Sequence, residues 1–292
     1  MKITTLDTGF GGERTTAAYL VESADGLVLC DTGAGPKAPD RILAGIDPHD
    51  IVGIVLTHIH LDHAGCAGEL MRRCPNAVLN VHPRGVRHMI DPSKLIAGAR
   101  EVWGADRFDS LYGEILSVEE SRVRQVSFGA GNGAFGLDFY DAPGHAKHHL
   151  VAHDPESRSV IAGDAFGLAY PEFDFSFPTT SPVQFEPNVM MSTFRSIHLL
   201  RPKTICVGHF GSFKYLPVRQ ATMSSIIMQI LIIYQKYQSL PDIDEVIAEA
   251  WIELVKQQDP EAVERYRVDC EINAQGMLNW VNSPDGKRAM HL

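Results

Sequence analysis

Three histidines and one aspartate lie within six positions of the segment LTHIHLDHAG, residues 56–65: His58, His60, Asp62 and His63. They follow an apolar run at 51–57 that is typical of a buried strand. Side chains at i and i+2 of extended backbone point the same way, so His58 and His60 can reach one metal ion together. Asp62 and His63 come where the chain turns into a helical pattern, so they can face a neighbouring position. Imidazole and carboxylate are usual ligands of zinc and similar ions, and the segment therefore indicates part of a metal site.

Three further side chains of the same types follow other predicted strands. They are His145 in DAPGHAKHH, Asp164 in VIAGDAF and His209 in ICVGHFG. Glycine precedes each of the three, which lets the backbone pack close to a crowded site. The sequence therefore offers seven ligand-type residues for one site.

The elements that must position these residues alternate between strands and helices over residues 1–218. Predicted strands occupy 17–23, 27–33, 51–57, 77–82, 123–129, 135–145, 148–154, 159–165 and 204–209, and predicted helices cover 64–74 and 187–200. Residues 91–120 are expected to form a helical insertion, and the strands at 123–129 and 135–145 to pair around a glycine-rich turn. The alternation indicates an α/β architecture with helices covering sheets.

The composition shifts near residue 219, where the pattern becomes helical to the end of the chain. We therefore expect a catalytic domain at 1–218 and an appended helical region at 219–292. The apolar run at 226–234 needs covering, so the appended helices would form either a lid over the metal site or a dimer surface.

The order THIHLDHAG, PGH, GD and GH resembles the metallo-β-lactamase superfamily over roughly residues 1–218, nearest its lactonase and glyoxalase II-like branches. Asp31 in VLCDTG matches the aspartate that braces the metal loop there. The resemblance implies a four-layer αββα sandwich with a two-metal site on one edge. It also implies the metal ligands: His58, His60 and His145 for the first metal, Asp62, His63 and His209 for the second, and Asp164 bridging them.

The activity that the resemblance implies is a dinuclear metal-dependent hydrolase. A metal-bridging hydroxide would attack a carboxylic ester, thioester or lactone, and Asp62 would shuttle the proton. Zinc is the first expectation for both ions, with iron or manganese as alternatives. The rival function is a diiron protein that binds, senses or reduces dioxygen. Relatives with flavin-linked diiron chemistry usually carry a glutamate where this chain has His60.

Two features near the proposed ligands have open interpretations. His149 is expected to pack behind the ligands, whereas His148 faces either substrate or protein. Five aromatic residues follow Asp164, and they form either a pocket wall or ordinary core: Phe166, Tyr170, Phe173, Phe175 and Phe177. If they line a pocket, the Tyr170 hydroxyl could donate a hydrogen bond to a developing oxyanion.

Bulk properties narrow the expected partners and location. A net charge of −10 argues against a nucleic-acid or anionic membrane surface. The apolar run at 226–233 has eight residues, whereas about 20 span a bilayer. No secretory signal is visible, and five cysteines without a CxxC pattern fit buried thiols in a reducing cytoplasm. We therefore expect a cytoplasmic protein with a small-molecule substrate and no nucleic-acid or membrane partner. If the C-terminal helices form a dimer surface and not a lid, a homodimer would assemble through them.

Overall fold

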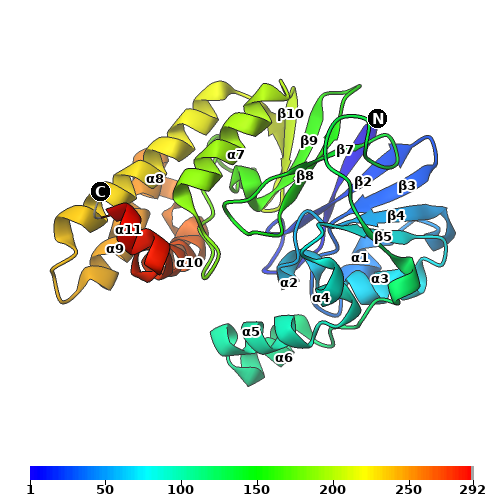
Figure 1. Cartoon of the computed structure of the whole chain (residues 1–292), viewed down its shortest axis with the longest axis horizontal. Helices are drawn as coiled ribbons and strands as arrows, with labels where there is room; N and C mark the ends of the chain where they lie inside the picture. Colours follow the sequence, from blue (N-terminus) through cyan, green and yellow to red (C-terminus); the bar gives the residue numbers. More distant parts are fainter. Residues whose placement is uncertain (291–292) are drawn as a thin grey trace.

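Two mixed β-sheets stack face to face in the computed structural model, which describes residues 1–290 apart from the side chains of Val102 and Trp103 (Figure 1). The first sheet has the order β1 (Lys2–Asp7), β2 (Ala17–Ser23), β3 (Gly26–Cys30), β4 (Ile51–Val55), β5 (Val78–Val81) and β6 (Val123–Gln125). The second has the order β11 (Gly211–Lys214), β10 (Thr204–Val207), β9 (Ser159–Gly163), β8 (Leu150–Asp154) and β7 (Asp138–Asp141). In the first sheet, β3 pairs parallel with β4, β4 with β5, and β5 with β6. In the second sheet, β9 pairs parallel with β10.

The inner faces of the two sheets share one apolar core. Tyr19 and Val28 of the first sheet belong to the same buried cluster as Phe139, Leu150 and Ile161 of the second. Alternate residues of β3 and β4 contribute instead to the outer cluster, as the two-residue period of a strand requires. Both faces of the central strands are therefore buried, which explains their apolar runs.

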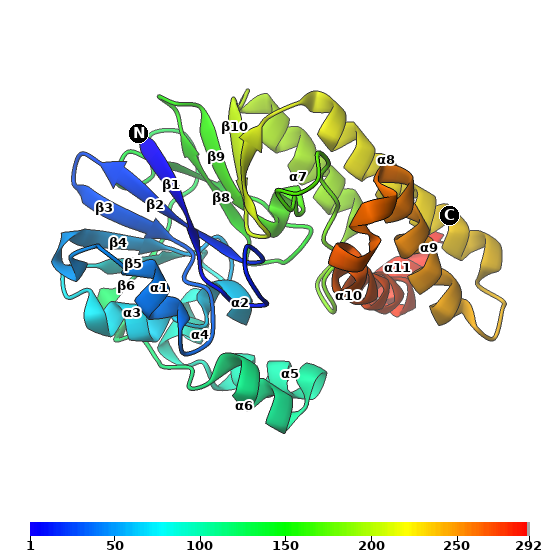
Figure 2. The same cartoon turned by 180° about the vertical axis from the view of Figure 1, so that it is seen from behind.

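Helices on the outer face of the first sheet form the third layer. They are α1 (Ala38–Ile42), α2 (Leu61–Ala64), α3 (Ala67–Arg73) and α4 (Val86–Ile90). The predicted helix at 64–74 is divided between α2 and α3. The expected helical insertion is α5 (Ser93–Trp103) and α6 (Ala105–Tyr112), a pair that projects from the sandwich (Figures 1 and 2).

The fourth layer covers the outer face of the second sheet. It begins with α7 (Pro187–Leu199) and α8 (Pro217–Tyr237). The helices α9 (Ile243–Gln258), α10 (Val263–Asn282) and α11 (Pro284–Met290) continue from α8 beyond the sheet. Proline begins α7 and α8 at the position where its missing N–H costs nothing. One buried cluster runs from β9 and β10 through α7 into α8, α9 and α10. The αββα fold with a C-terminal helical region is thereby confirmed.

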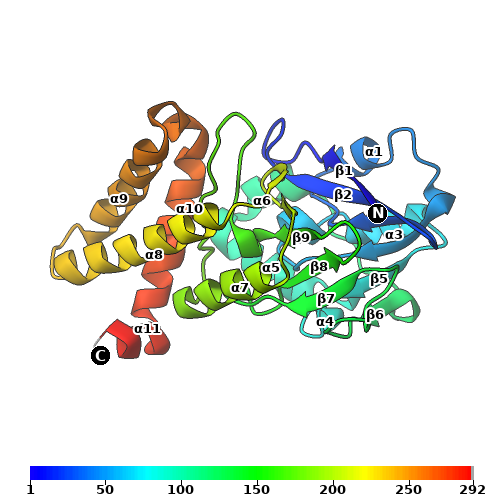
Figure 3. The same ribbon diagram turned by 90° about the horizontal axis from the view of Figure 1, so that it is seen from above.

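The C-terminal helices form a bundle at one end of the molecule (Figure 3). The last two positions of the predicted region 219–292 lie outside the described residues. Exposed apolar side chains remain on α8, among them Val218, Met228 and Ile232. The division of the chain at 218 and the role of these helices as lid or dimer surface stay predictions.

One predicted strand pairing is wrong. The strands within 123–129 and 135–145 do not pair with each other, because β6 joins β5 in the first sheet and β7 joins β8 in the second. The glycine-rich segment 129–136 carries the chain from one sheet to the other. The predicted hairpin at 148–165 is confirmed, since β8 and β9 pair antiparallel.

The sequence led us to expect buried cysteine thiols and no membrane-spanning segment. All five cysteines are buried and carry free thiols. Within the described residues, no helix combines the length and apolar character needed to cross a bilayer.

Candidate metal centre

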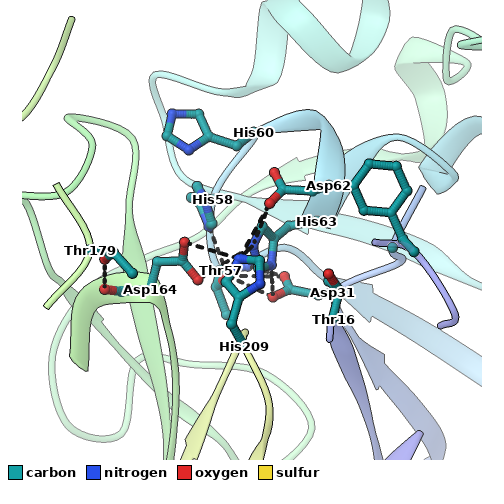
Figure 4. Close-up of polar contacts among 12 residues, drawn as sticks. Thr16, Asp31, Thr57, His58, His60, Asp62, His63, Asp164, Thr179 and His209 are labelled. Carbon is teal, nitrogen blue, oxygen red and sulfur yellow. Dashed lines mark hydrogen bonds and ion pairs between the residues drawn. The ribbon is translucent and has the colours of Figure 1, made fainter. Parts of the chain in front are cut away.

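The seven ligand-type side chains meet at the edge of the sandwich where several strands end. His58, His60, Asp62 and His63 follow β4, and His145 follows β7. Asp164 follows β9, and His209 follows β10. Parallel neighbours such as β9 and β10 end at the same edge, which brings side chains from distant segments together. Figure 4 shows Asp164 facing His63, Asp62 and His209 across this edge.

Three histidines form a first group whose ring nitrogens lie within 4.8 Å of one another: His58, His60 and His145. His60 Nδ1 is 3.0 Å from His145 Nε2. His58 Nδ1 contacts the Thr57 hydroxyl at 3.2 Å, whereas His58 Nε2 is buried without a hydrogen-bond partner among the described residues. An unpaired buried nitrogen is costly, so this group has a lone pair available for a cation.

Asp62, His63 and His209 form a second group of the same compactness. The Oδ2 atom of Asp62 is 3.4 Å from His63 Nε2 and 3.3 Å from His209 Nε2. The two histidine Nε2 atoms are 3.3 Å apart. One carboxylate and two imidazoles at this spacing can share one divalent ion.

Asp164 lies between the two groups. Its Oδ2 atom is 3.5 Å from His145 Nε2 and also 3.5 Å from His209 Nε2. Its Oδ1 atom is 3.4 Å from His63 Nε2. The Asp164 carboxylate therefore contacts both groups, as a bridging position requires.

A hydrogen-bonded layer behind the second group holds His63. Asp31 accepts from the Thr57 backbone N–H at 2.8 Å and from its hydroxyl, and its Oδ2 is 3.1 Å from His63 Nδ1. An acceptor on Nδ1 leaves Nε2 free to face a cation. This placement agrees with the bracing role expected of Asp31.

The histidines of the two groups have pKa values shifted in opposite directions. Burial lowers the pKa of His58 well below its ordinary value, and it lowers that of His60 to about 3. Burial also acts on His63 and His209, but Asp62 and Asp164 outweigh it, raising the pKa of His63 well above normal and that of His209 to about 10. Conversely, burial would raise the pKa of both carboxyls, but the neighbouring histidines hold it well below normal. Without metal, the second group is thus a network of ion pairs.

The donor set fits divalent cations. It contains imidazole and carboxylate and lacks thiolate. Buried nitrogens of His58 and His209 and a buried oxygen of Asp164 have no hydrogen-bond partner within the described part of the chain. Closed structural zinc sites are usually richer in cysteine. The seven residues therefore suit one or two ions of the zinc or iron class, which are the metals usual for imidazole ligands.

We expect metal loading of the second group to release protons. Coordination requires neutral imidazole, and His63 and His209 carry raised pKa values in the metal-free protein. Filling this group at pH 7 should therefore release about two protons per chain, and its apparent affinity should rise with pH. The first group, with its lowered pKa values, should release none. Calorimetric zinc titration in two buffers of different ionisation enthalpy measures this; identical heats in both buffers would contradict it.

Two histidines outside the proposed ligand set, His148 and His149, lie beside the metal-ligand groups. His149 is buried, its ring stacks on His58, and its Nε2 accepts from the Asp164 backbone N–H at 3.2 Å. The packing role predicted for His149 is confirmed. His148 is 7% exposed, and its Nδ1 accepts a 3.4 Å hydrogen bond from the Ile59 backbone N–H. His148 thus faces protein on that side.

The aromatic segment after Asp164 belongs to the core. Phe166 and Phe177 are fully buried, and Phe177 packs on Trp251 of α9 and Tyr266 of α10. The Tyr170 hydroxyl donates to the Asp269 carboxylate at 3.1 Å. The interpretation as core packing is therefore the better one, and the Tyr170 hydroxyl is engaged by a carboxylate.

Sequence reasoning missed several residues that support the site. Thr57 precedes the histidine segment, and its position next to His58 could have marked it. Thr179 donates its hydroxyl to the Asp164 carbonyl at 2.9 Å, and Asn273 of α10 bonds the adjacent Thr180. No spacing in the sequence relates Asn273 to the metal segment.

Comparisons with known proteins are consistent with this geometry. The family model described as the metallo-beta-lactamase superfamily matches residues 11–209. The metallo-beta-lactamase fold-containing protein ST1585 of Sulfurisphaera tokodaii is 31% identical over 192 residues, 63% of this chain and 68% of that protein. The crystal structure of ST1585 aligns with a TM-score of 0.62 at 19% identity, covering 90% of this chain and 98% of that one.

Two other similar proteins carry more specific descriptions. An atrochrysone carboxyl ACP thioesterase of Aspergillus fumigatus is 26% identical over 157 residues, 51% of this chain and 39% of that enzyme. The match thus spans about two fifths of the thioesterase. The crystal structure of TTHA1623 in a di-iron-bound form aligns at 25% identity with a TM-score of 0.55, covering 73% of this chain and 94% of that one.

Proposed function

The chain belongs to the metallo-beta-lactamase superfamily, and from this premise we propose that it is a dinuclear metal-dependent hydrolase of a carboxylic ester, thioester or lactone. The observation that carries the proposal is the convergence of seven imidazole and carboxylate side chains on one sheet edge. Divalent ions held there would supply a water of lowered pKa and would polarise a carbonyl oxygen.

The proposed site residues would have three roles: holding the first ion, holding the second ion, and transferring a proton. Three histidines would hold the first ion: His58, His60 and His145. Asp62, His63 and His209 would hold the second, with Asp164 shared. Asp62 is the more exposed of the two carboxylates, with 26% of its side chain accessible to solvent against 5% for Asp164. It is therefore the group placed to take up and release the proton of the attacking water.

The similarity to a thioesterase supports hydrolysis of an acyl compound as the reaction. The alternative is a diiron protein that binds, senses or reduces dioxygen, and the di-iron form of TTHA1623 favours it. The same seven ligands suit zinc and iron, so the ligand set does not distinguish the two functions. The identity of the bound metal does. Stoichiometric iron with an oxygen-sensitive visible band supports the alternative, and zinc supports hydrolysis.

Assays on a panel of carboxylic esters, thioesters and lactones test the proposed hydrolysis. We expect metal removal by a chelator to lower the rate on the true substrate by roughly a thousandfold, since metal ions contribute several kcal/mol to such reactions. Added zinc or another divalent ion should restore the rate. A metal-free protein that hydrolyses the substrate as fast as the loaded one would contradict the proposal.

A further inference from the structure

Asn273 is a buried amide on α10, and it is only 2% exposed. Its Oδ1 accepts from the Thr180 backbone N–H at 2.7 Å, and its Nδ2 donates to the Pro178 carbonyl at 2.8 Å. Its own backbone carbonyl accepts from the Thr180 hydroxyl at 2.7 Å. One residue of the C-terminal region therefore fixes both sides of Thr179.

The backbone of α10 approaches this segment unusually closely. A Cβ atom on Gly276 would lie 1.4 Å from the Thr180 carbonyl oxygen, which no side chain could tolerate. Gly276 lies three residues after Asn273, so both face the segment 178–181 on the same side of the helix. The helix is thus fitted against residues 178–181 by a glycine as well as by hydrogen bonds.

Residues 179 and 181 in turn contact two of the proposed metal ligands. The Thr179 hydroxyl donates to the Asp164 carbonyl at 2.9 Å, and the Thr179 carbonyl lies 3.4 Å from His145 Nδ1. The Ser181 hydroxyl is 3.4 Å from the His145 carbonyl. Figure 4 shows Thr179 beside Asp164 on the side away from His209.

The contact between Thr179 and His145 determines which nitrogen of His145 carries the proton. A carbonyl only accepts, so this contact favours the proton on Nδ1. The lone pair then lies on Nε2, which faces His60 and Asp164 at 3.0 and 3.5 Å. Loss of the Thr179 position would let His145 adopt the other tautomer and turn its lone pair away.

We propose that Asn273 is a positioning residue of the metal centre, which holds the Thr179 carbonyl on His145 and the Thr179 hydroxyl on Asp164. The inference rests on the proposed metal site. It assigns to α10, which lies outside the matched range 11–209, a part in metal binding. Residues that orient metal ligands from behind typically change metal affinity by about 10–100-fold when they are replaced.

The test compares Asn273→Ala with Met277→Ala. Met277 is fully buried on the same helix, so its loss removes packing without touching residues 178–181 through a side-chain hydrogen bond. Zinc affinity is measured by competition with a chromophoric chelator, and unfolding temperature is measured in parallel. We expect Asn273→Ala to weaken zinc binding about 10–100-fold. Met277→Ala should leave zinc affinity nearly unchanged although it lowers the unfolding temperature.

A second readout uses the metal-free protein, so it does not depend on the proposed function. Nitrogen NMR of labelled histidines reports the tautomer of His145, which we expect to be protonated on Nδ1 in the wild type and mixed in Asn273→Ala. If that variant does not fold, Asn273→Asp keeps the acceptor for the Thr180 N–H. It replaces the donor to the Pro178 carbonyl by a carboxylate oxygen, which repels that carbonyl and adds a buried charge. An unchanged His145 tautomer with unchanged zinc affinity overturns the inference. A wild type that binds no metal overturns the proposed function instead.

Discussion

Asp164→Asn is expected to lower hydrolytic activity by about a hundredfold or more and to reduce the number of bound metal ions. Asparagine has nearly the same shape, so the change removes a negative charge that contacts His63, His145 and His209. Replacing a residue that only orients a metal ligand typically lowers metal affinity or activity by about 10–100-fold. Replacing a ligand shared by both ions should lower them at least as much. Activity on the identified substrate and metal content per chain measure the effect.

The matched control for this variant is Asp25→Asn, in the turn between β2 and β3. Asp25 is exposed and distant in sequence from every proposed ligand. We expect Asp25→Asn to keep wild-type activity and metal content. Full activity and a full metal complement in Asp164→Asn would show that the carboxylate is not a ligand.

Gly208→Ala is expected to weaken metal binding strongly while leaving the fold intact. A Cβ atom at this position would lie 2.4 Å from His63 Cε1 and 2.5 Å from Asp164 Oδ1. Both side chains are buried, so they must shift away from the positions in which the two groups meet. Because small displacements of ligands reduce affinity, we expect a loss of about 10–100-fold in zinc affinity.

Gly98→Ala is the corresponding control. Gly98 is in α5, and within the part of the chain that the structure describes, a Cβ atom there has no neighbour within 4 Å. Alanine in a helix should stabilise the protein by up to about 1 kcal/mol relative to glycine. Chelator competition and thermal unfolding on both variants make the comparison. Equal zinc affinity in Gly208→Ala and the wild type would contradict the close approach seen at Gly208.

The sequence allowed prediction of the parts that depend on short-range patterns. His58 and His60 follow an apolar strand at a spacing that places them together, and the structure has that strand as β4. The glycine before His209 was expected to permit close packing, and the contact distances at Gly208 confirm this. The four-layer fold also followed from the resemblance and is confirmed.

Other features depend on contacts between distant segments and left no local signal. The strands β6 and β7 flank a glycine-rich turn like a hairpin, and only their different neighbours, β5 and β8, reveal that they lie in separate sheets. The contact of Asn273 with Thr180 joins positions 93 residues apart. Aromatic residues after Asp164 could equally line a pocket or fill a core until α9 and α10 were placed over them.

Metal content per chain tests whether the seven imidazole and carboxylate side chains hold two metal ions. Purified protein is loaded with excess zinc, freed of unbound metal, and analysed by plasma mass spectrometry beside His58→Ala and the exposed control His49→Ala. We expect two bound ions in the wild type and in His49→Ala, and fewer in His58→Ala, because a buried nitrogen of His58 has no hydrogen-bond partner among the residues that the structure describes. Wild-type protein that retains no ion under these conditions, or a His58→Ala variant that retains two, would contradict this expectation.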